Sequence, residues 1–170
     1  MSKKHVQLSW QNDTVPISKK FQDSYYSLEN GLHEANYVFI DGNNLQKRLS
    51  HGFQIAELGF GTGLNFLATC AAWNKASKTG KFNFVSFEGY PISNSDLRKA
   101  NLFFPELSEY AEMLQTRWDE IIEGNLVDFG YANLKVFVGD VSKTLKVFNS
   151  KVDCWFLDGF APNKLSLIHI

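Results

Sequence analysis

Three glycines stand at alternate positions in the stretch Gly59-Phe60-Gly61-Thr62-Gly63, directly after a short apolar run. Glycine lets the backbone bend sharply and lets a ligand approach the main chain closely. Where such a turn opens a helix, the N–H groups of the first helical turn also point at negative groups of a ligand. These residue types and their spacing predict a site for a nucleotide-like ligand. The alternative is a tight strand-to-helix turn that binds nothing.

The spacing of the glycines separates this turn from the dinucleotide-binding fingerprint. In that fingerprint, G-x-G-x-x-G, the third glycine comes three residues after the second, whereas Leu64 occupies that place here. Glu57 precedes the first glycine by two residues, and Asn65 follows the turn within the expected helix. The resulting E-x-G-x-G-x-G string resembles the first motif of class I S-adenosylmethionine-dependent methyltransferases. This resemblance implies that the methionine part of the cofactor lies beside the turn.

Acidic residues also stand at the ends of three other expected strands. They are Glu88 after the run from Lys81, Asp140 after Leu134–Val138, and Asp158 after Val152–Leu157. In an open α/β sheet the carboxyl ends of parallel strands meet at one edge, where ligands bind. We therefore expect these carboxylates and the glycine turn to surround one pocket.

Two of these acids have a nucleoside role and a simpler structural alternative. Glu88 follows the glycines near the spacing of about 20 residues at which an acid accepts hydrogen bonds from ribose hydroxyls; the alternative is a solvated glutamate at the end of a strand. Asp140 either caps the short helix that follows it or binds the adenine amino group, and the two roles are compatible.

The elements needed to position these residues can be followed along the chain. Phe53–Leu58 predicts a strand, and the 3.6-residue period after Leu64 predicts a helix. Ser95–Phe104 and Pro105–Trp118 predict two further helices, and Leu126–Val138 predicts a hairpin around a glycine turn. The nearly continuous apolar run at Val152–Leu157 is typical of a central parallel strand. The pattern predicts an α/β fold with a Rossmann-like sheet.

Residues 1–50 precede the glycine motif, and we expect an N-terminal β-hairpin and helical extension packed on the core. Alternating residues around Val6–Trp10 and Val15–Ile17 indicate the hairpin. The aromatic-rich stretch Phe21–Phe39 is expected to be mostly helical. Its aromatic residues either pack under the main sheet or form a flap that contributes contacts to the cofactor.

Composition limits the classes of function. The 170 residues fit one domain, and 44% hydrophobic with 15% aromatic residues supply a core. With a net charge of −1, the protein has no overall positive field that would attract a polyanion such as nucleic acid. Cys70 and Cys154 are expected in the core, and they make a poor zinc site without a histidine pair. With no signal peptide and no membrane span in the sequence, we expect a cytoplasmic protein without metal.

One family resemblance covers residues 6–163. The chain resembles the methyltransferase domains of bifunctional tRNA 5-methylaminomethyl-2-thiouridine biosynthesis proteins, which are class I S-adenosylmethionine-dependent methyltransferases. The strings that carry it are Glu57-Leu58-Gly59-Phe60-Gly61-Thr62-Gly63-Leu64-Asn65-Phe66, Ser86-Phe87-Glu88 and Trp155-Phe156-Leu157-Asp158-Gly159-Phe160-Ala161-Pro162. The resemblance implies S-adenosylmethionine as cofactor and N-methylation of the 5-aminomethyl group of the wobble uridine in the tRNA anticodon loop. It also implies a flavin-dependent oxidase domain, normally fused in the family, that this chain lacks.

The resemblance also bears on domain organisation. It implies a longer sheet than the chain contains, so we expect a C-terminally truncated sheet. Residues 51–163 are then a partial S-adenosylmethionine-binding methyltransferase domain. Because the sequence departs from the family pattern at Lys164, residues 164–170 are expected to be a non-native tail.

Methyl transfer to an amine requires a nitrogen that has lost its proton, and alkylamines hold theirs near neutral pH. Asp158 is the catalytic candidate, because a carboxylate beside the methyl group would hold the amine and take its proton directly or through water. It is equally a candidate to anchor the amino group of the cofactor. Phe160 and Pro162 are candidate substrate contacts, and Phe160 either stacks on the uracil or simply packs.

Three hypotheses follow from these residues. The first is the tRNA-modifying N-methyltransferase. The second is a transferase of related fold that acts on a small amine, such as an aminopropyltransferase; that family uses paired acids around its diamine, and the sequence offers only Asp158. The third is a non-catalytic remnant, because the expected sheet is incomplete.

Overall fold

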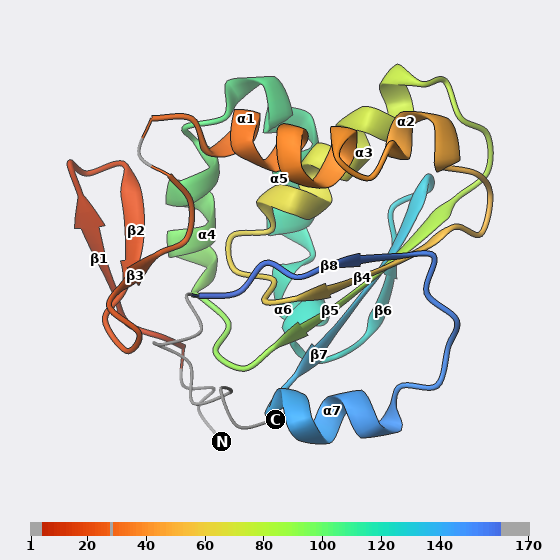
Figure 1. Cartoon of the computed structure of the whole chain (residues 1–170). Helices are drawn as coiled ribbons and strands as arrows, with labels where there is room; N and C mark the ends of the chain where they lie inside the picture. The colour runs from red at the N-terminus through yellow and green to blue at the C-terminus, as the bar shows by residue number, and fades with distance from the viewer. Residues whose placement is uncertain (1–4, 28, 161–170) are drawn as a thin grey trace.

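The computed structural model describes residues 5–27 and 29–160. It contains a five-stranded sheet with helices on both faces and a small three-stranded sheet at one side (Figure 1). The main sheet has the order β6-β7-β5-β4-β8. Its strands are β4 Gln54–Leu58, β5 Phe82–Glu88, β6 Leu126–Asp128, β7 Ala132–Val138 and β8 Cys154–Phe156.

The strand order reverses at β4, the first strand of the main sheet along the chain. Strands β4, β5, β7 and β8 are parallel, and only β6 runs antiparallel, in the predicted hairpin with β7. The chain moves from β4 outward to β5 and β7 and then returns to β8 on the other side of β4. Ligands bind outside the carboxyl ends of the strands at such a reversal. The predicted Rossmann-like fold is confirmed.

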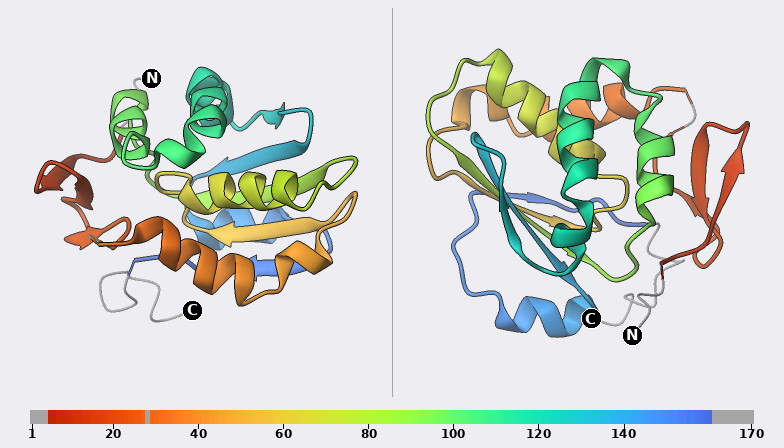
Figure 2. Two further views of the ribbon diagram at one scale, coloured as in Figure 1. Left: turned by 90° about the horizontal axis from the view of Figure 1, so that it is seen from above. Right: turned by 180° about the vertical axis from the view of Figure 1, so that it is seen from behind.

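Helices cover the two faces of this sheet unequally. Above it in Figure 1 lies α3 (Leu64–Lys75), which follows the glycine turn, and the view from above in Figure 2 shows further helices beside α3. Of the helices in the described residues, only α7 (Val141–Val147) lies below the sheet. The remaining helices of this part of the chain are α4 Asn94–Asn101, the 3₁₀ turn η2 Pro105–Leu107, α5 Ser108–Thr116 and α6 Trp118–Ile122.

The core lies between the sheet and α3. Phe66 of α3 meets Phe84 of β5 edge to face, with ring centroids 5.3 Å apart, and Phe84 in turn meets Phe156 of β8 at 5.9 Å. All three side chains are fully buried, and burial of one such side chain stabilises the fold by about 1.5–3 kcal/mol. Cys70 and Cys154 are buried free thiols, as predicted. The cluster fixes β4, β5 and β8 against the helix that begins at the glycine turn.

The N-terminal part confirms the predicted hairpin and corrects the helix prediction. Its strands are β1 Leu8–Gln11, β2 Val15–Ser18 and β3 Asp23–Ser24, and its helical segments are α1 Gly31–Ala35, the π-helical η1 Asn36–Asp41 and α2 Leu45–Arg48. The prediction that Phe21–Phe39 is mostly helical was wrong for its first half, where the described residues form turns, β3 and bends. Gln22 has φ +52°, a conformation that ends a helix, and the helix begins only at Gly31.

The helix expected over Pro105–Trp118 is also divided. Its first residues form the 3₁₀ turn η2, and Arg117, with φ −105° and ψ 8°, separates α5 from α6. Within the described residues, no helix has the length and apolar character that a bilayer span requires.

Candidate cofactor and substrate site

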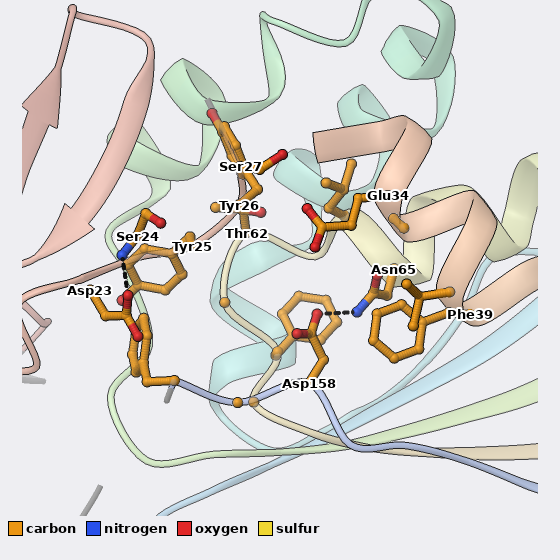
Figure 3. Close-up of a pocket in the computed structure, with 18 of the residues that line it drawn as sticks. Asp23, Ser24, Tyr25, Tyr26, Ser27, Glu34, Phe39, Thr62, Asn65 and Asp158 are labelled. Carbon is orange, nitrogen blue, oxygen red and sulfur yellow. Dashed lines mark hydrogen bonds between the residues drawn. The ribbon is translucent and has the colours of Figure 1, made fainter. Parts of the chain in front are cut away.

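A cavity of about 480 Å³ opens at the carboxyl ends of β4 and β8 (Figure 3). Its walls are the glycine turn, the start of α3, the loop after β8 and the segment that joins β3 to η1. The predicted site residues that line it are Gly59, Phe60, Gly61, Thr62, Asn65, Asp158 and Phe160. The glycine turn and the loop after β8, far apart in the sequence, therefore form one site.

Two glycines allow the walls of this cavity to approach one another. Gly59 has φ +88°, and a Cβ there would lie 2.8 Å from the carbonyl oxygen of Asp158. Gly61 has φ +55°, and a Cβ there would lie 2.9 Å from the ring of Tyr25. A side chain at either position would be strained and would push away the loop after β8 or the N-terminal segment.

A hydrogen-bond network that is buried at Glu57 and reaches the surface at Asp158 holds Asp158 in place. The side-chain amide of Asn65 donates hydrogen bonds to Glu57 Oε1 at 3.0 Å and to Asp158 Oδ2 at 2.7 Å. Ser86 Oγ donates to Glu57 Oε2 at 2.9 Å. Glu57 is 1% exposed and lies behind Asn65, outside the cavity lining. The structure therefore places Glu57 as a support for Asn65 and Asp158 rather than as a wall of the cavity.

Burial changes the acidity of both carboxyl groups in this network. It raises the pKa of Glu57 well above its usual range, and the hydrogen bonds from Asn65 and Ser86 oppose that rise only in part. Burial also raises the pKa of Asp158, while the bond from Asn65 lowers it and the charge of Glu34 raises it further. Each group thus favours its neutral form more than a solvated carboxyl does.

Glu88 lies next to the glycine turn, although it does not line the cavity. Its Oε2 accepts a hydrogen bond from the Gly61 N–H at 3.0 Å, and its Oε1 accepts one from the Tyr90 N–H at 2.7 Å. Burial raises the pKa of Glu88, and these backbone bonds lower it. The carboxylate ties the end of β5 to the turn, and its binding of ribose hydroxyls stays a prediction.

Aromatic rings lie between the cavity and the loop that follows Glu88. Phe160 contacts Tyr25 with ring centroids 5.0 Å apart and Phe21 at 4.9 Å. Phe21 also meets Tyr90 edge to face at 5.5 Å. The packing role predicted for Phe160 is therefore present, and its stacking on a substrate base stays a prediction. Pro162 and residues 164–170 lie outside the described residues.

Asp140 stands apart from the cavity. Its Oδ1 accepts hydrogen bonds from the Ser142 N–H at 2.8 Å and from Ser142 Oγ at 2.6 Å, so it caps α7. These bonds lower the pKa of Asp140. The predicted cap is confirmed, and the predicted contact with adenine stays a prediction.

The aromatic stretch Phe21–Phe39, expected either to pack under the main sheet or to form a flap over the cofactor, supplies a wall of the cavity. Tyr25, Glu34 and Phe39 all line it. Phe39 also contacts Phe156 of the core, with ring centroids 4.9 Å apart. The sequence offered one usable signal, the aromatic and acidic stretch around Glu34, but no spacing rule placed that stretch beside the glycine turn. Among the described residues, no group of three metal-ligating side chains occurs.

Comparison with known proteins connects this geometry to one family. A family described as S-adenosyl-L-methionine-dependent methyltransferase matches residues 105–168. The tRNA 5-methylaminomethyl-2-thiouridine biosynthesis bifunctional protein MnmC of Leptospira borgpetersenii is 44% identical over 165 residues, covering 92% of this chain and 25% of that protein. MnmC of Vibrio cholerae is 41% identical over 177 residues, covering 94% and 26%.

A solved structure shows the same fold. The crystal structure of MNMC2 from Aquifex aeolicus matches with a TM-score of 0.69 at 24% identity, covering 95% of this chain and 52% of that chain. The chain spans about a quarter of the length of the curated relatives that it matches. The chain thus matches a family of S-adenosyl-L-methionine-dependent methyltransferases over residues 105–168 and is similar to MnmC over nearly all of its own length.

Proposed function

We propose that this chain transfers a methyl group from S-adenosylmethionine to the 5-aminomethyl group of 5-aminomethyl-2-thiouridine, the wobble uridine in the anticodon loop of certain tRNAs. The observation that carries the proposal is Asp158, which Asn65 fixes in a cavity beside the glycine turn. The names of the MnmC relatives support the substrate. A methyltransferase with this substrate would work in the cytoplasm.

The residues around the cavity fit the cofactor. Its volume of about 480 Å³ lies within the range of about 300–1,000 Å³ that is usual for small-molecule sites. The main chain at Gly59 and Gly61 would lie against the methionine part, with Asn65 beside it. Glu88 would accept hydrogen bonds from the ribose hydroxyls, and Asp140 would reach the adenine amino group. When bound, S-adenosylmethionine supplies an electrophilic methyl group on a sulfonium.

Asp158 has two roles under this proposal. Its carboxylate would hold the substrate amine, which at neutral pH carries a proton by analogy with lysine, whose pKa is about 10.4. It would then accept that proton directly or through water, leaving the nitrogen lone pair free. Asp158 would equally be able to bind the amino group of the cofactor. Phe160 and Pro162 would contact the uridine.

The proposal assigns methyl transfer to residues 51–163, with residues 1–50 as an extension that completes the cavity wall. In the bifunctional relatives, a flavin-dependent oxidase domain in another part of the chain would prepare the amine. A second candidate is a transferase acting on a small amine, which the presence of both Glu34 and Asp158 in the cavity favours. A free diamine would then be modified in place of tRNA.

Two measurements test the proposal. Titration calorimetry should show binding of S-adenosylmethionine, and nucleosides from treated tRNA should show aminomethyluridine that has gained one methyl group. Asp158→Asn should lower the methylation rate about 10²-fold or more, because the proton acceptor is lost. Glu112→Gln, on the exposed surface of α5, is the control.

A negative result in either measurement would favour one of the alternative functions. Absence of cofactor binding would favour a non-catalytic chain, and cofactor binding with methylation of a free diamine alone would favour the small-amine transferase.

A further inference from the structure

The charged residues that line the cavity are all acidic. Three acidic residues line it, Asp23, Glu34 and Asp158, whereas no lysine, arginine or histidine occurs among the described residues of its lining. Glu34 is exposed, and within the described part of the chain its carboxylate makes no hydrogen bond or ion pair. A cavity of this kind favours a cationic ligand over a neutral or anionic one.

Glu34 and Asp158 reach the same space from different elements. Glu34 projects from α1 toward the place where Asp158 meets Asn65, as Figure 3 shows. The two charges interact, since the charge of Glu34 contributes to the raised pKa of Asp158. Asn65 donates to Oδ2 of Asp158, a residue of the cavity lining, so the carboxylate keeps further capacity to accept hydrogen bonds from a ligand.

We propose that Glu34 and Asp158 together bind an alkylammonium group, and that Glu34 determines the preference of this site for a cation. The inference rests on the proposed function, which supplies two sources of that group. One is the aminomethyl group of the substrate, and the other is the α-ammonium of S-adenosylmethionine. A primary ammonium carries three donors, so it can bond to both carboxylates at once.

The aromatic rings that line the cavity also favour a cationic ligand. Tyr25, Phe39 and Phe160 line the same space. The faces of aromatic rings attract cations and exclude the water that would otherwise solvate an ammonium. Without a bound cation the two carboxylates repel each other, so an ammonium between them removes an unfavourable interaction and adds hydrogen bonds.

The experiment measures binding of three nucleosides to the full chain and to Glu34→Gln. S-adenosylmethionine carries a sulfonium and an α-ammonium, S-adenosylhomocysteine carries the α-ammonium alone, and methylthioadenosine carries neither. The KM for tRNA with 5-aminomethyl-2-thiouridine is measured on both proteins. Glu112→Gln, which removes one exposed glutamate of α5 away from the cavity, is the matched control.

If Glu34 binds the cofactor, Glu34→Gln should weaken S-adenosylmethionine and S-adenosylhomocysteine equally, by about tenfold, and leave methylthioadenosine unchanged. If Glu34 binds the substrate, the three affinities should stay the same and KM for the tRNA should rise by about tenfold. Equal affinities together with an unchanged KM would overturn the inference, as would a loss confined to S-adenosylmethionine, which would indicate contact with the sulfonium. Failure of the unaltered chain to bind S-adenosylmethionine would instead remove the proposed function itself.

Discussion

The carboxyl group of Glu57 is enclosed by protein and satisfied by two neutral donors, the amide of Asn65 and the hydroxyl of Ser86. Burial raises its pKa, so the folded state keeps a proton that the unfolded chain releases as the pH rises above the usual carboxyl range. In that window the unfolded state binds fewer protons, and the stability of the fold falls as the pH rises. The interior of the site therefore costs stability at neutral pH.

Glu57→Gln tests this cost. Glutamine has the same shape, can accept from Asn65 and donate to Ser86, and never ionises, so the variant should melt at a higher temperature than the parent at pH 8. Below about pH 3, where the carboxyl holds its proton in both states of the parent, the difference should vanish. Each kcal/mol would appear as about 2–4 °C in a protein of this size. Thermal melts across this pH range, with Glu112→Gln as control, decide the point, and a difference that grew toward low pH would contradict it.

At the scale of elements, the glycine turn and the loop after β8 form one unit. Gly59 touches the main chain of Asp158, and Gly130, in the β6–β7 hairpin, offers a matched comparison. Both have φ +88°, but a Cβ at Gly130 would meet nothing within 4 Å, whereas at Gly59 it would lie 2.8 Å from a carbonyl oxygen. The pair separates backbone strain from steric conflict.

We expect Gly130→Ala to lower the free energy of unfolding by about 1–2 kcal/mol, from the left-handed backbone alone. Gly59→Ala should lower it by about 1–3 kcal/mol more, because the loop after β8 must move. It should also weaken S-adenosylmethionine binding, while Gly130→Ala leaves that affinity unchanged. Denaturant unfolding and calorimetry measure the two effects. Equal losses of stability in the two variants would show that the close approach at Gly59 does not matter.

Local signals were sufficient for some elements and insufficient for others. Strand β4, the glycine turn and α3 each carry their own period or turn chemistry, so the sequence predicts them. The stretch containing Tyr25 and Tyr26 does not, because the two neighbours bury their rings against different partners. Tyr25 lies on Gly61, whereas Tyr26 packs against Phe104 and donates to the Thr14 carbonyl. Such burial arises from tertiary packing and leaves no helical or strand period.

The difference between local signals and tertiary packing also explains which residues of the site could be predicted. Glycine spacing and the acid after β8 predicted the part of the cavity wall that the main sheet supplies, because parallel strands bring their carboxyl ends together. The position of Glu34 depends on how α1 packs beside α3, and no spacing rule contains that information. The sequence likewise did not predict that Glu57 lies behind Asn65, because an acid before a glycine turn can face either the ligand or the core.

At the scale of the whole molecule, the two faces of the sheet differ in their cover. Within residues 29–160, helix α7 alone lies below the sheet. Trp155 on that face is 40% exposed, whereas its neighbour Phe156 is fully buried on the other face. Parallel pairing of Trp155 with Ala56 sets this alternation. A slip of one residue would exchange the two side chains.

Fluorescence quenching by iodide tests the arrangement. Trp155→Phe should remove much of the quenchable emission, because iodide reaches an exposed indole. Trp73→Phe should leave the quenchable part unchanged, since Trp73 is 1% exposed in the core. No loss of quenchable emission in Trp155→Phe would mean that β8 presents its other face to α3.

The hydrogen bond between Asn65 and Asp158 joins residues 93 positions apart. A ribosome adding about 5–20 residues per second needs roughly 5–20 s to make the chain between them. Once Lys75 has been added, the nascent chain contains every residue of the glycine turn and α3 but still lacks the carboxylate that faces them. Any sulfonium nucleoside held in the completed cavity therefore reports a chain synthesised at least as far as the loop after β8.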